Sequence, residues 1–172
     1  PANPDIHSKT AAIEIWEQSN HNIDGLVTGV GTGGTVTGCA TYLKKVNPKC
    51  KIYAVEPKKS AVISGSTPGS HSIQGIGAGF IPKVLKKELI DEIVKIDDDE
   101  AFFFGRILAK MEGLLSGISS GAAMAATVKI AKRKELCGKR IVVILPSFGE
   151  RYLSTAMFDN NTSITAREDG YL

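Results

Sequence analysis

The sequence contains few of the residues that build disulfide frameworks, metal sites or membrane spans. It has only three cysteines, Cys39, Cys50 and Cys137, and none of them form a Cys-x-x-Cys pair. An odd, scattered set of this kind argues against a disulfide framework and against a cysteine-based metal site, and free thiols are typical of a reducing compartment. No apolar run approaches the roughly 18 residues that cross a bilayer. We therefore expect a cytoplasmic protein without a metal site and without membrane attachment.

The sequence also lacks a strong charge of either sign and is poor in aromatic residues. Lysine and arginine number 21 against 18 acidic residues, for a net charge of +3, and aromatic residues make up 6% of the chain. The one basic cluster, residues 129–140, contains no aromatic residue, so it is typical of a solvated helix face rather than of a nucleic-acid site. With 172 residues, 42% of them hydrophobic, the chain is long enough to bury one core.

Short apolar stretches alternate with stretches of helical periodicity along the chain. This alternation predicts an α/β fold, a parallel sheet with helices on both faces. In such sheets the carboxyl ends of the strands carry the ligand site, so the turns at residues 31–35, 117–121 and 146–151 should cluster. The strands are expected at residues 24–28, 51–56, 92–96 and 140–145, and the helices at 6–19, 35–46, 97–110 and 122–131.

Five glycines fall within the eleven residues TGVGTGGTVTG, residues 28–38, between an expected strand and an expected helix. Gly29, Gly31 and Gly34 match the spacing Gly-x-Gly-x-x-Gly of dinucleotide-binding turns, and Glu56 follows at the end of the next strand, where an acidic residue would bind a ribose hydroxyl. A module that binds NAD is therefore one hypothesis. A tight turn without a ligand is another.

The same turn is also suited to a smaller anion. Thr32 and Thr35 flank Gly33 and Gly34 and place hydroxyl groups beside the free N–H groups of a helix N-terminus, which together form a cup for a phosphate group. The turn lacks the Gly-Lys-Ser/Thr ending of a nucleotide P-loop, which argues against ATP chemistry.

Six segments taken together carry a resemblance to a known family. The segments PANPDIH, GVGTGGTVTG, VEP, IQGIGAGFIP, EGLLSGISSGAA and VVILPSFGERYLST resemble the carboxy-terminal half of cysteine synthases (O-acetylserine sulfhydrylases), which are pyridoxal-phosphate (PLP) enzymes of the tryptophan-synthase β-like, type II fold. The resemblance implies that residues 1–159 form the larger, PLP-binding domain of this fold, without the family's amino-terminal half. Residues 160–172 match nothing in the family and are expected to be a flexible tail.

The resemblance also implies roles for particular residues. The glycine-rich turn would bind the cofactor phosphate, and Ser119 would bind the pyridine nitrogen, although from sequence alone a helix cap is the simpler interpretation of this serine. Ser120 is the more natural cap of the next helix. The implied cofactor-binding residues are Gly31, Thr32, Gly33, Gly34, Thr35, Ser119 and Ser147, and the implied substrate-side loop comprises Gln74, Gly75, Ile76 and Gly77.

The activity implied is the β-replacement of O-acetyl-L-serine with sulfide, through an aminoacrylate, to give L-cysteine and acetate in a homodimer. The family's Schiff-base lysine and its Ser/Thr-Ser-Gly-Asn-Thr-Gly loop are both missing, so no catalytic residue is assigned and the chain alone is expected to be inactive. It would be either a piece of an enzyme or a non-catalytic paralogue that binds a partner's C-terminal peptide in the old cleft. Thr67 and Ser72 replace lysines implicated in holding serine acetyltransferase, which weakens the expectation of that partner.

Overall fold

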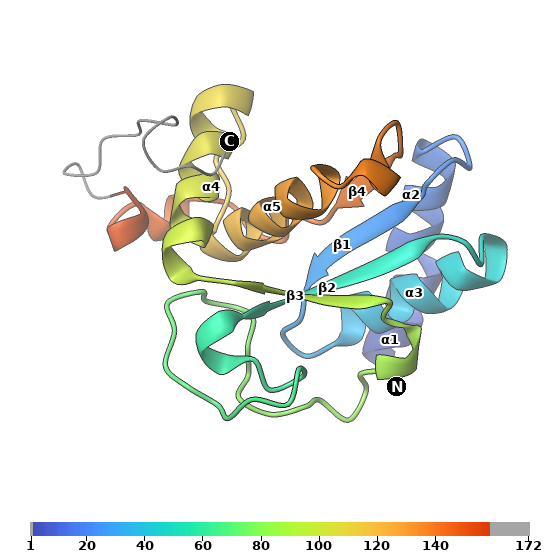
Figure 1. The fold of residues 1–172 in the computed structure, drawn as a ribbon, viewed down its shortest axis with the longest axis horizontal. Helices are drawn as coiled ribbons and strands as arrows, with labels where there is room; N and C mark the ends of the chain where they lie inside the picture. The colour runs from blue at the N-terminus through green and yellow to red at the C-terminus, as the bar shows by residue number, and fades with distance from the viewer. Residues whose placement is uncertain (1, 159–172) are drawn as a thin grey trace.

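The four apolar stretches pair as one parallel sheet in the computed structural model, which describes residues 2–158 (Figure 1). The strand order is β3-β2-β1-β4, so β1 lies in the interior of the sheet and pairs with both β2 and β4. Within this register Val27 lies between Tyr53 and Val143. The strands are β1 (Gly25–Gly29), β2 (Lys51–Pro57), β3 (Glu92–Ile96) and β4 (Ile141–Val143).

Helices cover both faces of this sheet, and each face has its own apolar core. Successive side chains of a strand point to opposite faces, so Leu26 packs into one cluster with α2 and α3 while Val27 packs into the other with α4 and α5. Figure 1 shows α4 and α5 on one side of the strands and α1 and α3 on the other. The expected α/β architecture is thereby confirmed. The α-helices are α1 (Ala2–Lys9), α2 (Ala11–Gln18), α3 (Gly34–Val46), α4 (Asp98–Glu112) and α5 (Ile118–Ala131).

Two expected helix boundaries were wrong. The first helix, expected over residues 6–19, is divided at Thr10, whose φ of −125° and ψ of −89° are not helical. Helix α5 begins at Ile118 rather than at residue 122, with Gly117 as its N-cap, so Ser120 lies inside the helix and does not cap it. The Gly-Ser run predicted a turn because serine competes for backbone hydrogen bonds, but burial of this first turn outweighs that preference.

Five short 3₁₀ helices occur within residues 2–158. No helix within residues 2–158 is both long and apolar enough to cross a membrane. The 3₁₀ helices are η1 (Lys58–Ser60), η2 (Lys87–Leu89), η3 (Lys134–Leu136), η4 (Glu150–Tyr152) and η5 (Ala156–Phe158).

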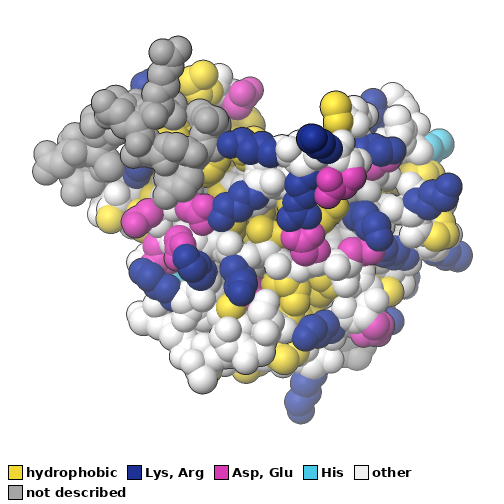
Figure 2. Space-filling view, in the orientation of Figure 1, with side chains coloured by type: hydrophobic (Ala, Val, Ile, Leu, Met, Phe, Trp, Pro, Cys, Tyr) yellow, Lys and Arg dark blue, Asp and Glu magenta, His cyan; other side chains and the backbone are white. Residues whose placement is uncertain are grey.

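A network of ion pairs joins the elements at the amino ends of the strands, where Figure 2 shows acidic groups interspersed among the basic ones. The carboxylate of Asp91 accepts hydrogen bonds from Lys44 Nζ at 2.6 Å, from Lys51 Nζ at 3.0 Å and from the Ile52 N–H at 2.8 Å. These bonds connect α3, β2 and the start of β3. Burial raises the pKa of Asp91, but the three hydrogen bonds outweigh burial and the net pKa lies below the ordinary value of 3.8.

We predict that this network makes stability fall in acid. Hydrogen bonds from Arg133, at 2.7 Å to each oxygen, lower the pKa of Glu92 below 4.5, and the Arg140 N–H lowers that of Asp24 below 3.8. A depressed folded-state pKa stabilises the fold above the unfolded-state value, and this contribution is lost as the pH falls through the folded value. The contribution of these carboxylates to the free energy of unfolding, measured by urea titration, should therefore not change with pH near neutrality. It should decrease below about pH 4.5.

An Asp91→Asn variant should be less stable at pH 7 and should lose less stability on acidification. Glu88→Gln serves as the control, because Glu88 is exposed and has no ion pair within residues 2–158. An unchanged acid dependence in Asp91→Asn would contradict the prediction.

Candidate functional site

A pocket of about 320 Å³ lies at the carboxyl ends of the strands. Its walls come from the turn between β1 and α3, the loop before β3, the first turn of α5 and the segment after β4. The three turns expected to cluster thus meet around one pocket. Its lining residues are Thr28, Gly29, Gly31, Thr32, Gly33, Gly34, Thr35, Gln74, Gly75, Ile76, Ser119, Ile144, Pro146, Ser147, Arg151 and Tyr152.

Glycine is required in the turn between β1 and α3 by close approach and by backbone conformation. Gly33 is the N-cap of α3 with a φ of +82°, in the left-handed region that disfavours other residues. A Cβ on Gly31 would clash with the carbonyl oxygen of Gly75, and one on Gly34 would clash with the side chain of Asn3. The turn therefore brings the free N–H groups at the N-terminus of α3 to the pocket, where their partial positive charge favours an anion.

The hydroxyl groups of this turn are held by side chains of α1. Asn3 Nδ2 donates to Thr32 Oγ1 at 3.2 Å, and a hydrogen bond of 3.3 Å joins Thr35 Oγ1 and His7 Nε2. Neither Asn3 nor His7 was predicted as a site residue. They lie 29 and 28 residues before their partners, and no local pattern indicated that α1 would pack beneath the turn.

Two serines line the other wall of the pocket. Ser119, in the first turn of α5, is 4% exposed, and a Cβ on Gly75 across the pocket would lie 3.8 Å from its Oγ. Because Gly117 caps the helix, the simpler interpretation of Ser119 as a cap is wrong. The Oγ of Ser147 is buried and unpaired. Polar groups buried without partners in a pocket are the groups that a ligand can satisfy.

The predicted substrate-side loop is placed only partly at the pocket. Gln74, Gly75 and Ile76 line it, but Gly77 does not. The N–H of Gly77 donates to the Val30 carbonyl at 3.0 Å, and a Cβ there would lie 2.7 Å from His71 Nε2. Gly77 therefore lies behind the pocket wall.

Glu56, the acidic residue of the dinucleotide hypothesis, has a structural role. It is 1% exposed, and its two carboxylate oxygens accept the N–H groups of Ile63 at 2.9 Å and Ser64 at 3.1 Å. It closes the loop after β2 and does not line the pocket. The glycine spacing thus lacks the acidic partner that a ribose would need, and the NAD hypothesis is not supported.

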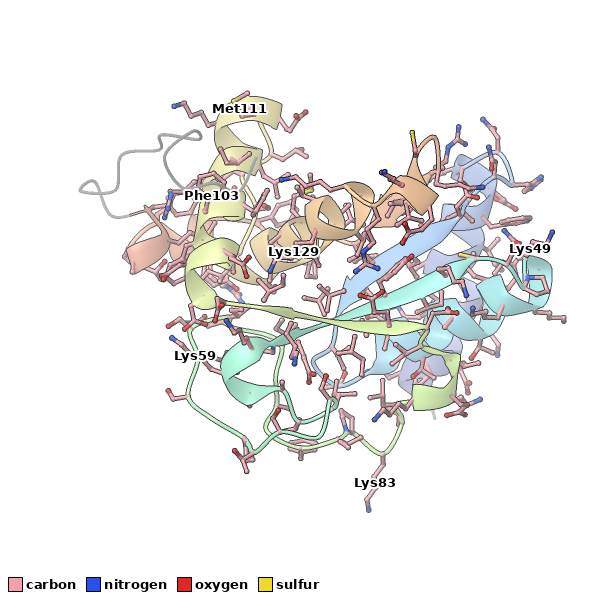
Figure 3. All side chains as sticks on the ribbon, viewed as in Figure 1. Lys49, Lys59, Lys83, Phe103, Met111 and Lys129 are labelled. Atoms are coloured by element: carbon pink, nitrogen blue, oxygen red, sulfur yellow. The ribbon has the colours of Figure 1, made fainter. Side chains whose placement is uncertain are left out.

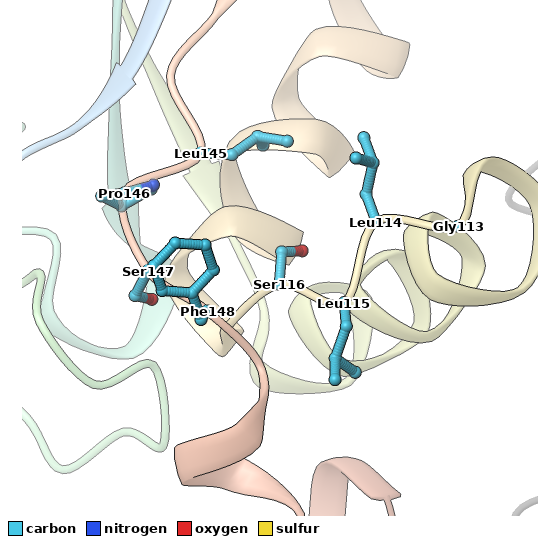
Figure 4. A pocket seen from close by; sticks show the side chains of 8 residues that line it. All are labelled: Gly113, Leu114, Leu115, Ser116, Leu145, Pro146, Ser147 and Phe148. Atoms are coloured by element: carbon cyan, nitrogen blue, oxygen red, sulfur yellow. The ribbon is translucent and has the colours of Figure 1, made fainter.

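A second, apolar groove of about 370 Å³ adjoins this pocket and shares Pro146 and Ser147 with it (Figure 4). Leu114, Leu115 and Phe148 line it and are 49%, 37% and 81% exposed. Apolar surface of this kind commonly marks a contact with other protein.

Arg151 lines the pocket, as expected for a residue of the turn at 146–151, although the sequence assigned it no role. Residues 2–158 contain no ion pair of Arg151. No lysine lines the pocket, and residues 2–158 contain no cluster of three metal-binding side chains.

Comparison with known proteins gives matches along nearly the whole chain. A family model described as "Pyridoxal-phosphate dependent enzyme" matches residues 1–147. The chain is 54% identical over 169 residues to a cysteine synthase of Buchnera aphidicola subsp. Schizaphis graminum. The aligned region covers 94% of this chain and 52% of the relative. The chain spans about half the length of the curated relatives that it matches.

Solved structures of two Entamoeba histolytica proteins show the same fold. A cysteine synthase superposes with a TM-score of 0.92 at 46% identity, covering 98% of this chain and 51% of the other. An O-acetyl serine sulfhydrylase, isoform 3, superposes with a TM-score of 0.94 at 45% identity, covering 100% and 52%.

Proposed function

Because the chain belongs to the family of pyridoxal-phosphate dependent enzymes, we propose that it forms the cofactor-binding part of a cysteine synthase. The observation that carries this proposal is the single pocket that joins the glycine turn, Ser119 and Ser147. Identities of 50–54% to cysteine synthases support the choice of activity within the family.

The glycine turn fits the phosphate group of the cofactor. Gly31, Gly33 and Gly34 leave no side chain between the backbone N–H groups and the pocket, and Thr32 and Thr35 add hydroxyl groups. Several N–H donors at a helix N-terminus can hold a dianion without a lysine beside them. The cup therefore supplies strong anchoring for one end of the cofactor.

The serine wall fits the ring. When bound, the cofactor supplies a conjugated ring that accepts electrons from the substrate. Ser119 would hold the pyridine nitrogen with a neutral hydroxyl, whereas an aspartate would keep that nitrogen protonated and strengthen the electron sink. A weaker sink suits β-elimination and replacement better than transamination.

The complete enzyme would take O-acetyl-L-serine and sulfide. The bond between the β-carbon and the acetyl oxygen breaks, acetate leaves, and sulfur forms a new bond to the same carbon. Gln74, Gly75 and Ile76 border the pocket where the amino acid would enter and help to exclude water. We also propose a homodimer and a cytoplasmic location, in line with the family resemblance and the free cysteines.

The proposal is tested by cofactor binding to this chain. We expect the purified chain to bind pyridoxal phosphate, and a Ser119→Ala variant to bind it about 2- to 12-fold more weakly, because a net hydrogen bond contributes about 0.5–1.5 kcal/mol. Affinities are measured by absorbance titration.

Ser66→Ala is the matched control, since Ser66 is exposed and lies outside the pocket. Equal affinities of the Ser119 variant and the wild type would show that Ser119 does not contact the cofactor. No binding by the wild-type chain would contradict the proposed function itself.

A further inference from the structure

Arg151 carries the only charge in the lining of the pocket within residues 2–158. The other lining residues are neutral, and no carboxylate there offsets the guanidinium. The side chain is exposed and has no salt bridge in the described part of the chain. An unpaired arginine beside a polar pocket is available to bind a ligand rather than to stabilise the fold.

The backbone that carries Arg151 is fixed. Arg151 is the middle residue of η4, which is preceded by a hydrogen bond of 3.0 Å from the Gly149 N–H to the Leu115 carbonyl. The next residue, Tyr152, is 4% exposed, and its ring lies so close to Gly117 that a Cβ there would be 3.1 Å from Tyr152 Cδ2. Arg151 is therefore carried by a segment that is anchored to residues 115–117 on both sides of it.

Two positive sources thus face one pocket from different sides. The N-terminus of α3 contributes its partial charge through the glycine turn, and Arg151 contributes a full charge from the segment after β4. Guanidinium groups bind carboxylate and phosphate oxygens in pairs, with geometry that a single lysine ammonium does not offer.

We propose that Arg151 is an anion-binding residue of this pocket, which takes a carboxylate or phosphate group of the bound ligand. It thereby adds a full positive charge to the partial charge that the glycine turn supplies. This inference rests on the proposed function for the identity of the ligands, an amino acid and a phosphorylated cofactor. The anion site itself rests on charge and geometry alone.

The test compares wild type, Arg151→Gln and Arg151→Lys. Each protein is titrated with inorganic phosphate and, separately, with acetate. Binding is monitored through the NMR chemical shifts of the backbone amides of residues 31–35 and of the side chain at position 151. We expect Arg151→Gln to lower the affinity for at least one of the two anions at least fivefold, and Arg151→Lys to lower that affinity less. The anion that is affected identifies the group that the arginine takes. Lys83→Gln is the control, because Lys83 is exposed, carries the same charge and lies outside this pocket (Figure 3).

Affinities of Arg151→Gln within twofold of wild type for both anions would overturn the proposal. So would an equal loss in Lys83→Gln, since that result would indicate net charge alone. A parallel titration with pyridoxal phosphate separates the two claims. If the wild-type chain does not bind the cofactor, the proposed function fails, while the phosphate and acetate titrations still decide the role of Arg151.

Discussion

A Gly121→Ala variant is expected to lose about 3 kcal/mol of unfolding free energy, at the upper end of what overpacking usually costs. Gly121 lies where α5 crosses α4. A Cβ there would clash with the carbonyl oxygen of Ala101 and would lie 2.7 Å from the Gly105 nitrogen and 3.0 Å from its Cα. All of these are backbone atoms, so the two helices would have to separate.

The sign of this change distinguishes a tight helix crossing from an open one. At an unobstructed helical position, alanine stabilises the helix by up to about 1 kcal/mol relative to glycine. The melting temperature should fall by roughly 6–12 °C, since a domain of this size loses about 2–4 °C per kcal/mol. Gly113→Ala is the control: no atom lies within 4 Å of its Cβ, and only its φ of +69° opposes alanine.

Gly105→Ala should be intermediate, because its Cβ would meet the flexible end of Met157, which can move. A melting temperature of Gly121→Ala at or above that of the wild type would show that the crossing is not tight.

The sheet could be predicted from the sequence because its two inner strands, β1 and β2, are short apolar runs that are buried along almost their whole length. The edge strand β3 also has the expected bounds, residues 92–96, although Glu92 and Lys95 lie within it. The start of α5 could not be predicted, because its first turn is rich in serine and glycine and is helical only through burial against the rest of the fold. Local preference and tertiary packing conflict there, and packing decides the conformation.

The pocket could be predicted in outline but not in detail. The density of glycine indicated a turn that a ligand approaches, yet the spacing alone fitted a dinucleotide and a phosphate equally well. The distinction depends on Glu56, whose carboxylate is bound by two backbone N–H groups seven and eight residues later. The position of Asn3 depends on how a segment 29 residues before its partner packs, which no local pattern records.

The largest functional effect is expected from Gly33→Val, which should weaken the binding of pyridoxal phosphate by about 100-fold or more, or about 2.7 kcal/mol. Gly33 has a φ of +82°, which a β-branched residue adopts only with strain. Its Cβ would also lie 3.1 Å from Leu85 Cβ and 3.2 Å from Leu85 Cδ1, so the turn would have to shift. Such a shift would misdirect the N–H groups at the N-terminus of α3 that the phosphate needs.

Gly65→Val separates this effect from backbone strain alone. Gly65 has a φ of +90° with no atom within 4 Å of its Cβ, and it lies outside the pocket. Both variants should therefore lose a similar amount of stability from the left-handed backbone, while only Gly33→Val should lose the cofactor. Affinity is measured by absorbance titration and folding by circular dichroism. If a folded Gly33→Val variant bound pyridoxal phosphate as tightly as Gly65→Val does, the phosphate would have to be held elsewhere, and the cup between β1 and α3 would have no part in cofactor binding.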